Sequence, residues 1–170
     1  MDAETKRTGA NCQNSHALPV RVRLRRLALR AAAYGIFGWC VEVLFTGIKS
    51  GLRKDRSLTS RTYLWMFPIY ALAAPLFEPM HDRLRNLPPV VRAPVYAAGI
   101  MSVEYAAGWI LHKTLGACPW DYSQSTPFHI KGYVRLDYAP LWALAGLALE
   151  QVHDRLDAVV AALEDSRAKT

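Results

Sequence analysis

Apolar residues gather in four blocks of roughly 20 residues, separated by polar segments. A block of this length, wound as an α-helix, crosses the roughly 30 Å hydrocarbon core of a bilayer. The blocks predict membrane spans at Leu27–Ile48, Thr62–Met80, Val91–His112 and Leu136–Val152. We therefore expect an all-α integral membrane protein with four transmembrane helices.

The remaining segments complete the expected domain organisation. Residues 1–26 form a polar, then arginine-rich, cytoplasmic tail; residues 27–84 and 85–153 form two transmembrane hairpins, the second with an outer loop at 113–135. Prolines interrupt the second span, which membrane helices tolerate where neighbouring helices satisfy the freed carbonyl groups. Apolar residues recur at helical spacing within 154–170, so the last helix is expected to continue into the cytoplasm as an amphipathic extension.

Composition and charge exclude other classes of protein. The chain is 52% hydrophobic and 21% charged, which excludes a disordered or fibrous protein. A formal charge of +7 would suggest nucleic acid as the partner of a soluble protein. Here the basic residues stand at the ends of the apolar blocks, where they anchor helices at anionic head groups. The expected partners are the lipid bilayer and either further copies of this chain or a second subunit, and not nucleic acid.

Cysteines and charges bear on processing and topology. Cys12, Cys40 and Cys118 are an odd number at wide spacings, which predicts neither a disulfide framework nor a zinc pattern. The first 20 residues are polar and the first apolar stretch is too long for a signal peptide, so the first helix is expected to remain as an anchor. The side that holds both termini carries 13 of the 21 lysines and arginines. The positive-inside rule therefore predicts cytoplasmic termini, in the inner cell membrane.

The chain also matches itself. Residues 68–84 match residues 140–156 at an offset of 72, with nine of 17 positions identical. A weaker match, at an offset of 62, pairs Arg30, Ala31, Tyr34, Val41 and Glu42 with Arg92, Ala93, Tyr96, Val103 and Glu104. Two spans per unit predict two parallel hairpin repeats, related by an axis along the membrane normal.

Each expected span carries one glutamate, and the four are Glu42, Glu78, Glu104 and Glu150. A carboxylate at membrane depth is costly, so by default it faces the bundle interior or a wet cavity and marks a candidate site. Small residues share a helical stripe with each glutamate, which indicates helix–helix faces. The acids therefore either line a cavity or only hold the helices together by hydrogen bonds.

The residue types also match a di-metal carboxylate centre, which takes two lone glutamates and two Glu-x-x-His units from a four-helix bundle. The corresponding set is Glu42, Glu78, His81, Glu104, Glu150 and His153. Depth argues against this set. If Arg30, Arg83, Arg92 and Arg155 mark the inner boundary, Glu42 and Glu104 lie about 18 Å from it at 1.5 Å per residue, whereas the other two glutamates lie about 7.5 Å from it. Metal ligands must converge within about 2–2.5 Å of the ion. Without a helix break we expect no metal.

Two layers of acids remain, one near the inner face and one at mid-membrane. Together they resemble a path for protons or cations. His81 and His153 are the weaker candidates for this path, because a histidine beside Asp and Arg at a helix end is more often an interfacial anchor.

The outer loop is too long for a simple turn. Its central motif is Cys118, Pro119, Trp120, Asp121, Tyr122 and Ser123. Aromatic and polar residues alternate, a mixture suited either to the head-group layer or to a lid over the mouth of the bundle. A purely structural cap anchored by Trp and Tyr is the alternative.

Four stretches carry a resemblance to a known family. They are residues 38–46, residues 64–70, Val103-Glu104-Tyr105 with Gly108, and above all residues 117–123. Together they resemble the transmembrane protein 229 family, grouped with bacterial proteins labelled "putative ABC-transporter type IV", over about Tyr34–Arg155. The resemblance implies a small multi-pass membrane protein with in-membrane glutamates and no established chemistry. The two histidines and the arginine-rich N-terminal segment are not features of that family.

Three functions remain open. The leading prediction is a small transporter or permease-like component, in which Glu42 and Glu104 line a cavity for a cation, a proton or a small polar solute. The alternatives are a membrane-embedded di-metal enzyme acting on lipid and a helix-bundle scaffold without a ligand. No Gly-x-x-x-x-Gly-Lys-Ser/Thr loop occurs, so the chain cannot bind ATP in the usual way, and no cofactor is predicted. Four spans are few for a complete permease, so transport would need an oligomer or a partner.

Overall fold

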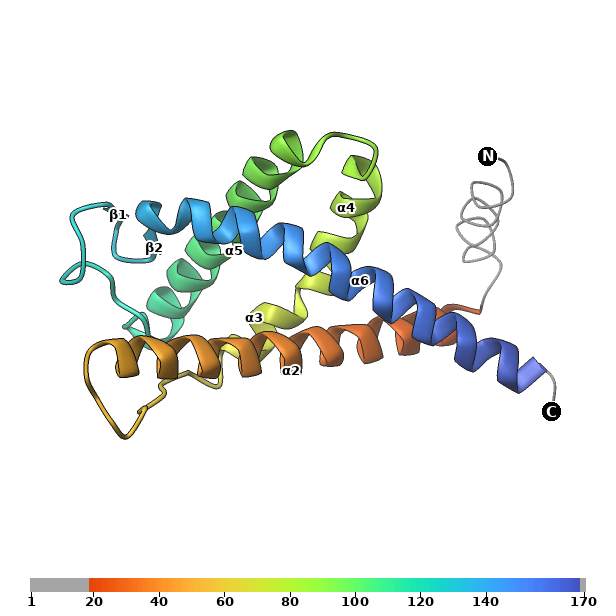
Figure 1. Cartoon of the computed structure of the whole chain (residues 1–170), viewed down its shortest axis with the longest axis horizontal. Helices are drawn as coiled ribbons and strands as arrows, with labels where there is room; N and C mark the ends of the chain where they lie inside the picture. The colour runs from red at the N-terminus through yellow and green to blue at the C-terminus, as the bar shows by residue number, and fades with distance from the viewer. Residues whose placement is uncertain (1–18, 169–170) are drawn as a thin grey trace.

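The computed structural model describes residues 19–168, with side-chain environments as far as Val160. Most of the expected N-terminal tail, residues 1–18, therefore lies outside the described residues. The side chains of the expected C-terminal extension are described only as far as Val160, so residue 163 of its apolar pattern is not among them. The described chain is mostly helical (Figure 1). The predicted all-α class is confirmed.

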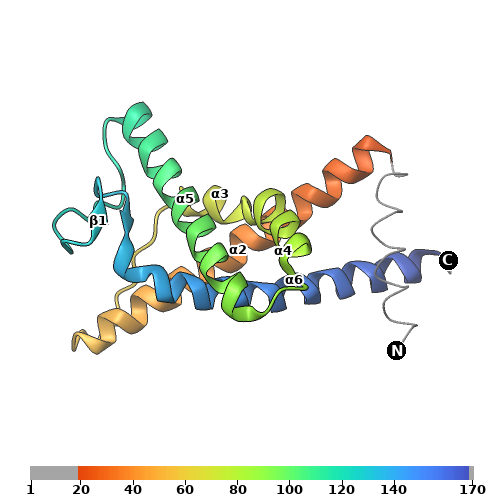
Figure 2. The same ribbon diagram turned by 90° about the horizontal axis from the view of Figure 1, so that it is seen from above.

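Two long helices, α2 (Val20–Leu52) and α6 (Ala139–Ala168), extend along the long axis of the molecule (Figures 1 and 2). The helical segments between them are α3 (Met66–Ala71), the π-helical turn η2 (Ala73–Phe77), α4 (Glu78–Leu84) and α5 (Pro89–Leu115). A small antiparallel pair, β1 (His129–Ile130) and β2 (Val134–Arg135), and a 3-10 turn, η3 (Leu136–Tyr138), precede α6. In this pair His129 lies opposite Arg135.

The helices pack as two hairpins in chain order. Helix α2 packs on α3 and η2, and α5 packs along α6, while α3 also contacts α5. Small residues permit the close approaches: a Cβ at Gly38 on α2 would overlap the Tyr70 ring, and one at Gly146 on α6 would overlap the Tyr96 side chain. The predicted small-residue stripes therefore do face neighbouring helices at these positions.

Proline interrupts the helix of the second expected span. Pro75 lies within η2 and has no N–H to donate to the carbonyl four residues before it. The backbone widens to a π turn there and returns to α-helix at Glu78. Ala74 and Phe77, on either side of this proline, are buried.

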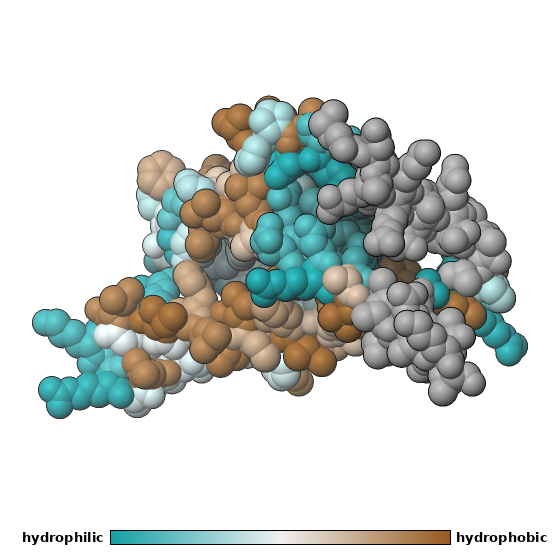
Figure 3. Space-filling model, turned by 45° about the vertical axis from the view of Figure 1, so that its right-hand side comes forward, coloured by the Kyte–Doolittle hydropathy of each residue, from teal (hydrophilic) through white to brown (hydrophobic). Residues whose placement is uncertain are grey.

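Apolar and polar side chains are distributed as in a protein that lies in lipid. Helix α2 exposes large apolar side chains, including Ile36, Phe37, Val41, Leu44 and Ile48, and Figure 3 shows apolar residues along this edge of the molecule. The buried residues include polar ones, namely His81, Glu104, Glu150 and His153. An extended exposed apolar surface over a partly polar interior suits a hydrocarbon surrounding.

The four expected spans coincide with helical segments, and α6 continues well past Val152, as the C-terminal pattern predicted. Within residues 19–168, one helix, α2, combines the length and the apolar composition needed to cross a membrane. The membrane class is supported at this coarse level. Four crossings, the direction of the hairpins and the cytoplasmic termini stay predictions.

Candidate functional site

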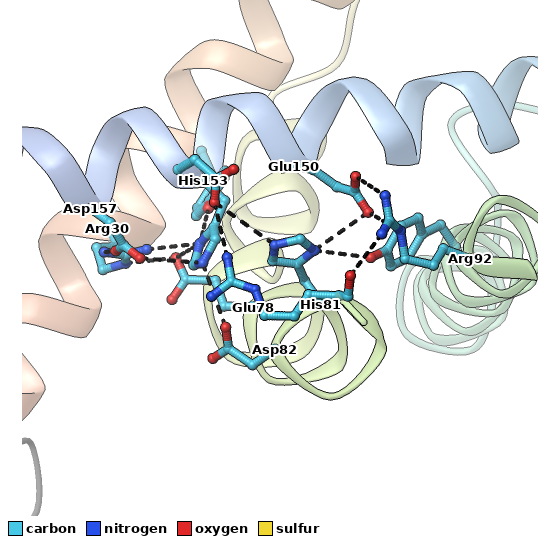
Figure 4. A network of polar contacts seen from close by, with 12 residues as sticks. Arg30, Glu78, His81, Asp82, Arg92, Glu150, His153 and Asp157 are labelled. Carbon is cyan, nitrogen blue, oxygen red and sulfur yellow. Dashed lines mark hydrogen bonds and ion pairs between the residues drawn. The ribbon is translucent and has the colours of Figure 1, made fainter. Parts of the chain in front are cut away.

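Polar residues from α2, α4, α5 and α6 meet in one connected cluster, shown in Figure 4. We call it the histidine network and define it as Arg30, Tyr34, Glu78, His81, Arg92, Tyr96, Glu150 and His153. His81 and His153 lie in its middle, and Arg30 and Arg92 lie at opposite ends (Figure 4). The two imidazole rings contact each other nearly edge-on, with centroids 5.1 Å apart.

At the α2 end, Arg30 is the centre of the contacts. Its Nε donates to Glu78 Oε1 at 2.6 Å, and its Nη1 donates to Asp157 Oδ1 at 2.5 Å. Its Nη2 lies 3.0 Å from His153 Nδ1, and the Tyr34 hydroxyl lies 3.3 Å from the same nitrogen. A buried carboxylate is thus neutralised by a guanidinium group from the preceding helix.

The α5 end has the same chemistry. Arg92 Nη2 donates to Glu150 Oε2 at 2.9 Å, and its Nε lies 2.9 Å from the other carboxylate oxygen. The Tyr96 hydroxyl lies 3.0 Å from His81 Nδ1. Arg92 Nη1 also donates to the carbonyl oxygens of Arg85 and Leu87, which ties the turn between α4 and α5 to the network.

The histidines cross between the two hairpins. His81, on α4, lies 3.5 Å from Glu150 on α6, and His153, on α6, lies 3.7 Å from Glu78 on α4. Each arginine, by contrast, pairs with a glutamate of its own hairpin. The Arg–Glu, Tyr–His and His–Glu contacts at one end therefore each have a counterpart at the other, made by residues 62 or 72 positions further along the chain. The bond from Arg30 to Asp157 and the bonds from Arg92 to two backbone carbonyls belong to one end each.

Burial and charge act differently on the two histidines, which lie just beyond the expected ends of the second and fourth spans. Burial, followed by the charge of neighbouring His153, lowers the pKa of His81. Burial also pulls down the pKa of His153, but nearby Glu78 and the charge of Asp157 outweigh it and raise that pKa above its usual value. The two similar rings are thus placed to differ in protonation.

The other two glutamates belong to a second layer. Tyr70 donates its hydroxyl hydrogen to Glu42 Oε2, and Tyr122 donates to Glu104 Oε1, both at 3.0 Å. Glu104 is 8% exposed. Its Oε2 is buried and makes no hydrogen bond of regular geometry to a described residue, and its polar neighbour is the Trp142 indole, whose N–H is likewise buried without a regular acceptor. This oxygen keeps lone pairs that can bind a proton, a water molecule or a cation.

The outer loop folds onto this second layer. Trp120 is buried, and its indole N–H donates to the Tyr133 carbonyl at 3.0 Å. Cys118 Sγ donates to the Trp120 carbonyl, and Asp121 accepts the backbone N–H of Ser123. That hydrogen bond lowers the pKa of Asp121. The bond from Tyr122 to Glu104 brings this loop, which we call the lid, into contact with a buried carboxylate. Whether it covers the mouth of the bundle or is a structural cap stays a prediction.

A cation lies over the same lid. The Arg135 guanidinium is 4.1 Å from the centroid of the Tyr138 ring and 5.7 Å from that of Tyr122, and it pairs with Asp137 at 2.5 Å. Lys49 Nζ donates to the Tyr138 hydroxyl at 3.0 Å. Aromatic rings and positive charges thus border the second layer on the side of the loop.

The predicted six-residue ligand set is divided between these surroundings. Glu42 and Glu104 bond to tyrosines, and Glu78 and Glu150 pair with arginines. The remaining two, His81 and His153, contact each other. This division into separate groups agrees with the expected difference in depth between Glu42 and Glu104 on one side and Glu78 and Glu150 on the other.

Two expectations need correction. The histidines are not interfacial anchors, because each is only 3% exposed and enclosed by aromatic and charged neighbours. Arg30 and Arg92 were taken only as markers of the membrane boundary, whereas they are the ion-pair partners of the inner glutamates. Both arginines and both tyrosines of the network occur in the self-match at an offset of 62, which was the signal available for finding them.

One surface groove lies between α5 and α6. It has a volume of about 390 Å³ and is lined by Pro94, Ala97, Ala98, Met101, Ala139, Pro140 and Ala143. No glutamate lines this groove, so it is not the predicted carboxylate-lined cavity.

Comparison with known proteins gives a family match. The sequence model of a family described as "Putative ABC-transporter type IV" matches residues 31–169. These residues include the lid and both polar layers except Arg30, which directly precedes the matched range. No solved structure matches the chain.

Proposed function

This chain belongs to the Putative ABC-transporter type IV family, and from that membership we propose that it is a small transporter or permease-like component with four membrane spans. In this proposal Glu42 and Glu104 bind or pass a cation, a proton or a small polar solute. The two hairpins are repeats that run the same way through an inner cell membrane, with both termini in the cytoplasm.

The observation that carries the proposal is the state of the Glu104 carboxylate. A carboxylate that only held helices together would be expected to use both oxygens in hydrogen bonds, because an unused buried acceptor is costly. Glu104 bonds one oxygen to a tyrosine of the lid, whereas its other oxygen is buried beside the Trp142 indole without a hydrogen bond of regular geometry within the described chain. This arrangement suits a group that takes up and releases a ligand.

The tyrosine partners extend the argument. A phenol can donate to a carboxylate and can accept a proton in turn, so Glu42–Tyr70 and Glu104–Tyr122 each form a short relay. Glu42 and Glu104 lie on α2 and α5, each 12 residues from the arginine of its own helix in the histidine network. That separation is about 18 Å along a helix, enough to set the two layers at different depths.

A flux measurement on the reconstituted protein tests this function. Wild-type protein, Glu42→Gln and Glu104→Gln are placed in liposomes, and proton and monovalent-cation fluxes are followed with indicator dyes. Glutamine keeps the shape of the side chain but loses its charge, so we expect about a tenfold or greater loss of flux with the protein still folded. The control is Asp55→Asn, which removes a carboxylate charge from the loop after α2, where its partners are Ser50 and Ser57 and not members of either polar layer.

The alternatives give different results. A scaffold without a ligand predicts that both glutamine variants behave like the wild type in the flux assay. No flux from the wild-type chain alone, at a protein density where each liposome holds several copies, would contradict transport by this chain or its homo-oligomer.

A further inference from the structure

The centre of the histidine network holds two buried imidazole rings where α4 meets α6. Their centroids are 5.1 Å apart, and each residue is only 3% exposed. Two imidazolium ions at this separation would repel one another inside a low-dielectric interior. At least one ring is therefore held neutral, with a lone pair available on one nitrogen.

One ring nitrogen of His81 has no hydrogen-bond partner. His81 Nε2 is buried and makes no hydrogen bond within residues 19–168, and Asp154 Oδ1 lies 3.9 Å from it. A ligand atom from each of His81, His153 and Asp154 lies within 4.8 Å of the others. Asp82 Oδ1 lies 3.8 Å from His153 Nε2 and brings a fourth donor to the group.

We propose that His81, His153, Asp154 and Asp82 bind one divalent transition-metal ion of the Zn²⁺ class. Two imidazole nitrogens and two carboxylate oxygens supply the four ligands of a tetrahedral zinc site. The aspartate side chains are about half exposed, so they are the ligands that can move toward the ion. The site is distinct from the acid pair of the proposed transport function and does not depend on it.

The opposite side of each ring supports the assignment. A histidine that binds a metal usually donates its other N–H to a carboxylate or another acceptor, which orients the ring. His81 Nδ1 lies 3.0 Å from the Tyr96 hydroxyl and 3.5 Å from Glu150 Oε1. His153 Nδ1 has the equivalent neighbours, the Tyr34 hydroxyl and Glu78 Oε1, at 3.3 and 3.7 Å.

Three contacts must change on binding. Arg85 donates to Asp154 Oδ1 at 3.4 Å. Asp157 Oδ2 lies 3.4 Å from His153 Nε2, nearer than Asp82 Oδ1. The side chains of Asp154 and Asp157 are about half exposed and can turn.

The third contact is made by Arg30. Arg30 Nη2 lies 3.0 Å from His153 Nδ1, and a guanidinium group can only donate, so it competes with an N–H at that position. Arg30 has closer partners in Glu78 and Asp157, at 2.6 and 2.5 Å, and keeps both if it turns away from the ring. The competing contact can therefore be lost while the ion pairs of Arg30 remain.

Charge and access also fit a divalent cation. The two imidazole rings contact five carboxylates, namely Glu78, Asp82, Glu150, Asp154 and Asp157. Within the described part of the chain, only three guanidinium groups pair with these carboxylates, namely Arg30, Arg85 and Arg92, so negative charge is in excess around the rings. The Asp82 and Asp154 side chains are 55% and 51% exposed, so an ion can reach the buried nitrogens from water. Imidazole ligands favour zinc and its neighbours over Mg²⁺ or Ca²⁺.

The test measures metal binding by the full chain in detergent. Wild-type protein is equilibrated with Zn²⁺ and dialysed, and the bound zinc is counted by mass spectrometry; Co²⁺ is then used as a visible probe of tetrahedral coordination. We expect about one ion per chain. We also expect zinc to raise the melting temperature of the wild type by mass action.

Two variants and one control make the result specific. His81→Gln removes a buried ligand, and Asp154→Asn removes an exposed one without disturbing packing, so the second variant still reports if the first fails to fold. Each should weaken zinc binding by at least about tenfold, whereas His112→Gln, at the outer end of α5, should bind as the wild type does. Absence of zinc uptake by the wild type, or equal uptake by wild type and Asp154→Asn with the Co²⁺ spectrum unchanged, would overturn the site.

Discussion

At the scale of residues, the chain combines apolar exposed surfaces with ion pairs in its interior. Glu78 and Glu150 are each paired with an arginine, and these side chains are between 8% and 15% exposed. Taking such charges out of water is costly, and the pairing recovers that cost only while both partners are present. The same two arginines also mark the expected inner boundary of the membrane, so one residue type serves both topology and packing.

Removing one member of a pair should therefore cost more than removing both. We expect Arg92→Met to lower the free energy of unfolding by about 3 kcal/mol, because it leaves the Glu150 carboxylate buried without its cation. Arg92→Met combined with Glu150→Met should regain part of this loss, although the bonds from Arg92 to two backbone carbonyls stay absent. Denaturant unfolding in detergent measures both.

Arg83→Met is the matched control for these variants. Arg83 is exposed and donates only to the Pro79 carbonyl in its own helix, so its loss should change the unfolding free energy by less than about 0.5 kcal/mol. A double variant less stable than Arg92→Met alone would show that the buried pair is not the source of the cost.

At the scale of elements, glycines set how closely the helices of each hairpin approach. Gly38 faces Tyr70 in the first hairpin, and Gly146 faces Tyr96 in the second. These tyrosines belong to the second layer and to the histidine network respectively. Helix spacing and the placement of polar groups are thus coupled through the same contacts.

We expect Gly146→Ala to destabilise the fold by about 1–3 kcal/mol, because the new Cβ would overlap a Tyr96 side chain that is itself fully buried. The shift of Tyr96 should also disturb its contact with His81 Nδ1. Thermal unfolding in detergent and hydrogen exchange of α4 would record the two effects.

Gly99→Ala on α5 is the comparison. A Cβ there would lie 3.4 Å from the flexible end of Met80, so the protein should tolerate it and gain up to about 1 kcal/mol from the higher helix propensity of alanine. Equal losses from the two substitutions would mean that helix approach at Gly146 does not limit stability.

At the scale of the whole molecule, the two polar layers and the lid stand in order along the bundle. The histidine network lies at the end where α4 turns into α5, and the lid, with Tyr122 on Glu104, lies toward the other end. If four spans cross the membrane, these ends face opposite compartments. The proposed zinc site and the proposed solute path would then open to different sides.

Labelling of single cysteines in intact cells tests this orientation. In a chain whose three native cysteines are replaced by serine, we expect Ser125→Cys in the lid to react with a membrane-impermeant maleimide from outside. Asn86→Cys, in the exposed turn between α4 and α5, should react only after the membrane is opened. The reverse pattern would invert the topology, and labelling of both positions from outside would exclude a crossing between them.

Local patterns in the sequence were sufficient for the helical elements and for the candidate acids. Apolar blocks and isolated glutamates are properties of neighbouring residues, so the all-α class and the continuation of α6 were predicted correctly. The second expected span was predicted as one helix, and the structure divides it at Pro75 into α3, η2 and α4. The matches at offsets of 62 and 72 also named the residues that make corresponding contacts. Burial of the histidines was not predicted, because helix ends were taken to lie at the interface with water.

The sequence by itself determined which segments are helical, which faces carry small residues and how many carboxylates the interior must accommodate, since these depend on spacing and hydropathy over a few turns. Only the tertiary structure decided the partners: Arg30 with Glu78, His81 with Glu150 of the other hairpin, and Tyr122 with Glu104. The partners of Arg30 alone lie 48 to 127 positions away. Pairing at such separations follows from how helices cross and from the cost of leaving a charge unpaired in a low dielectric. Neither can be predicted from the periodicity of neighbouring residues.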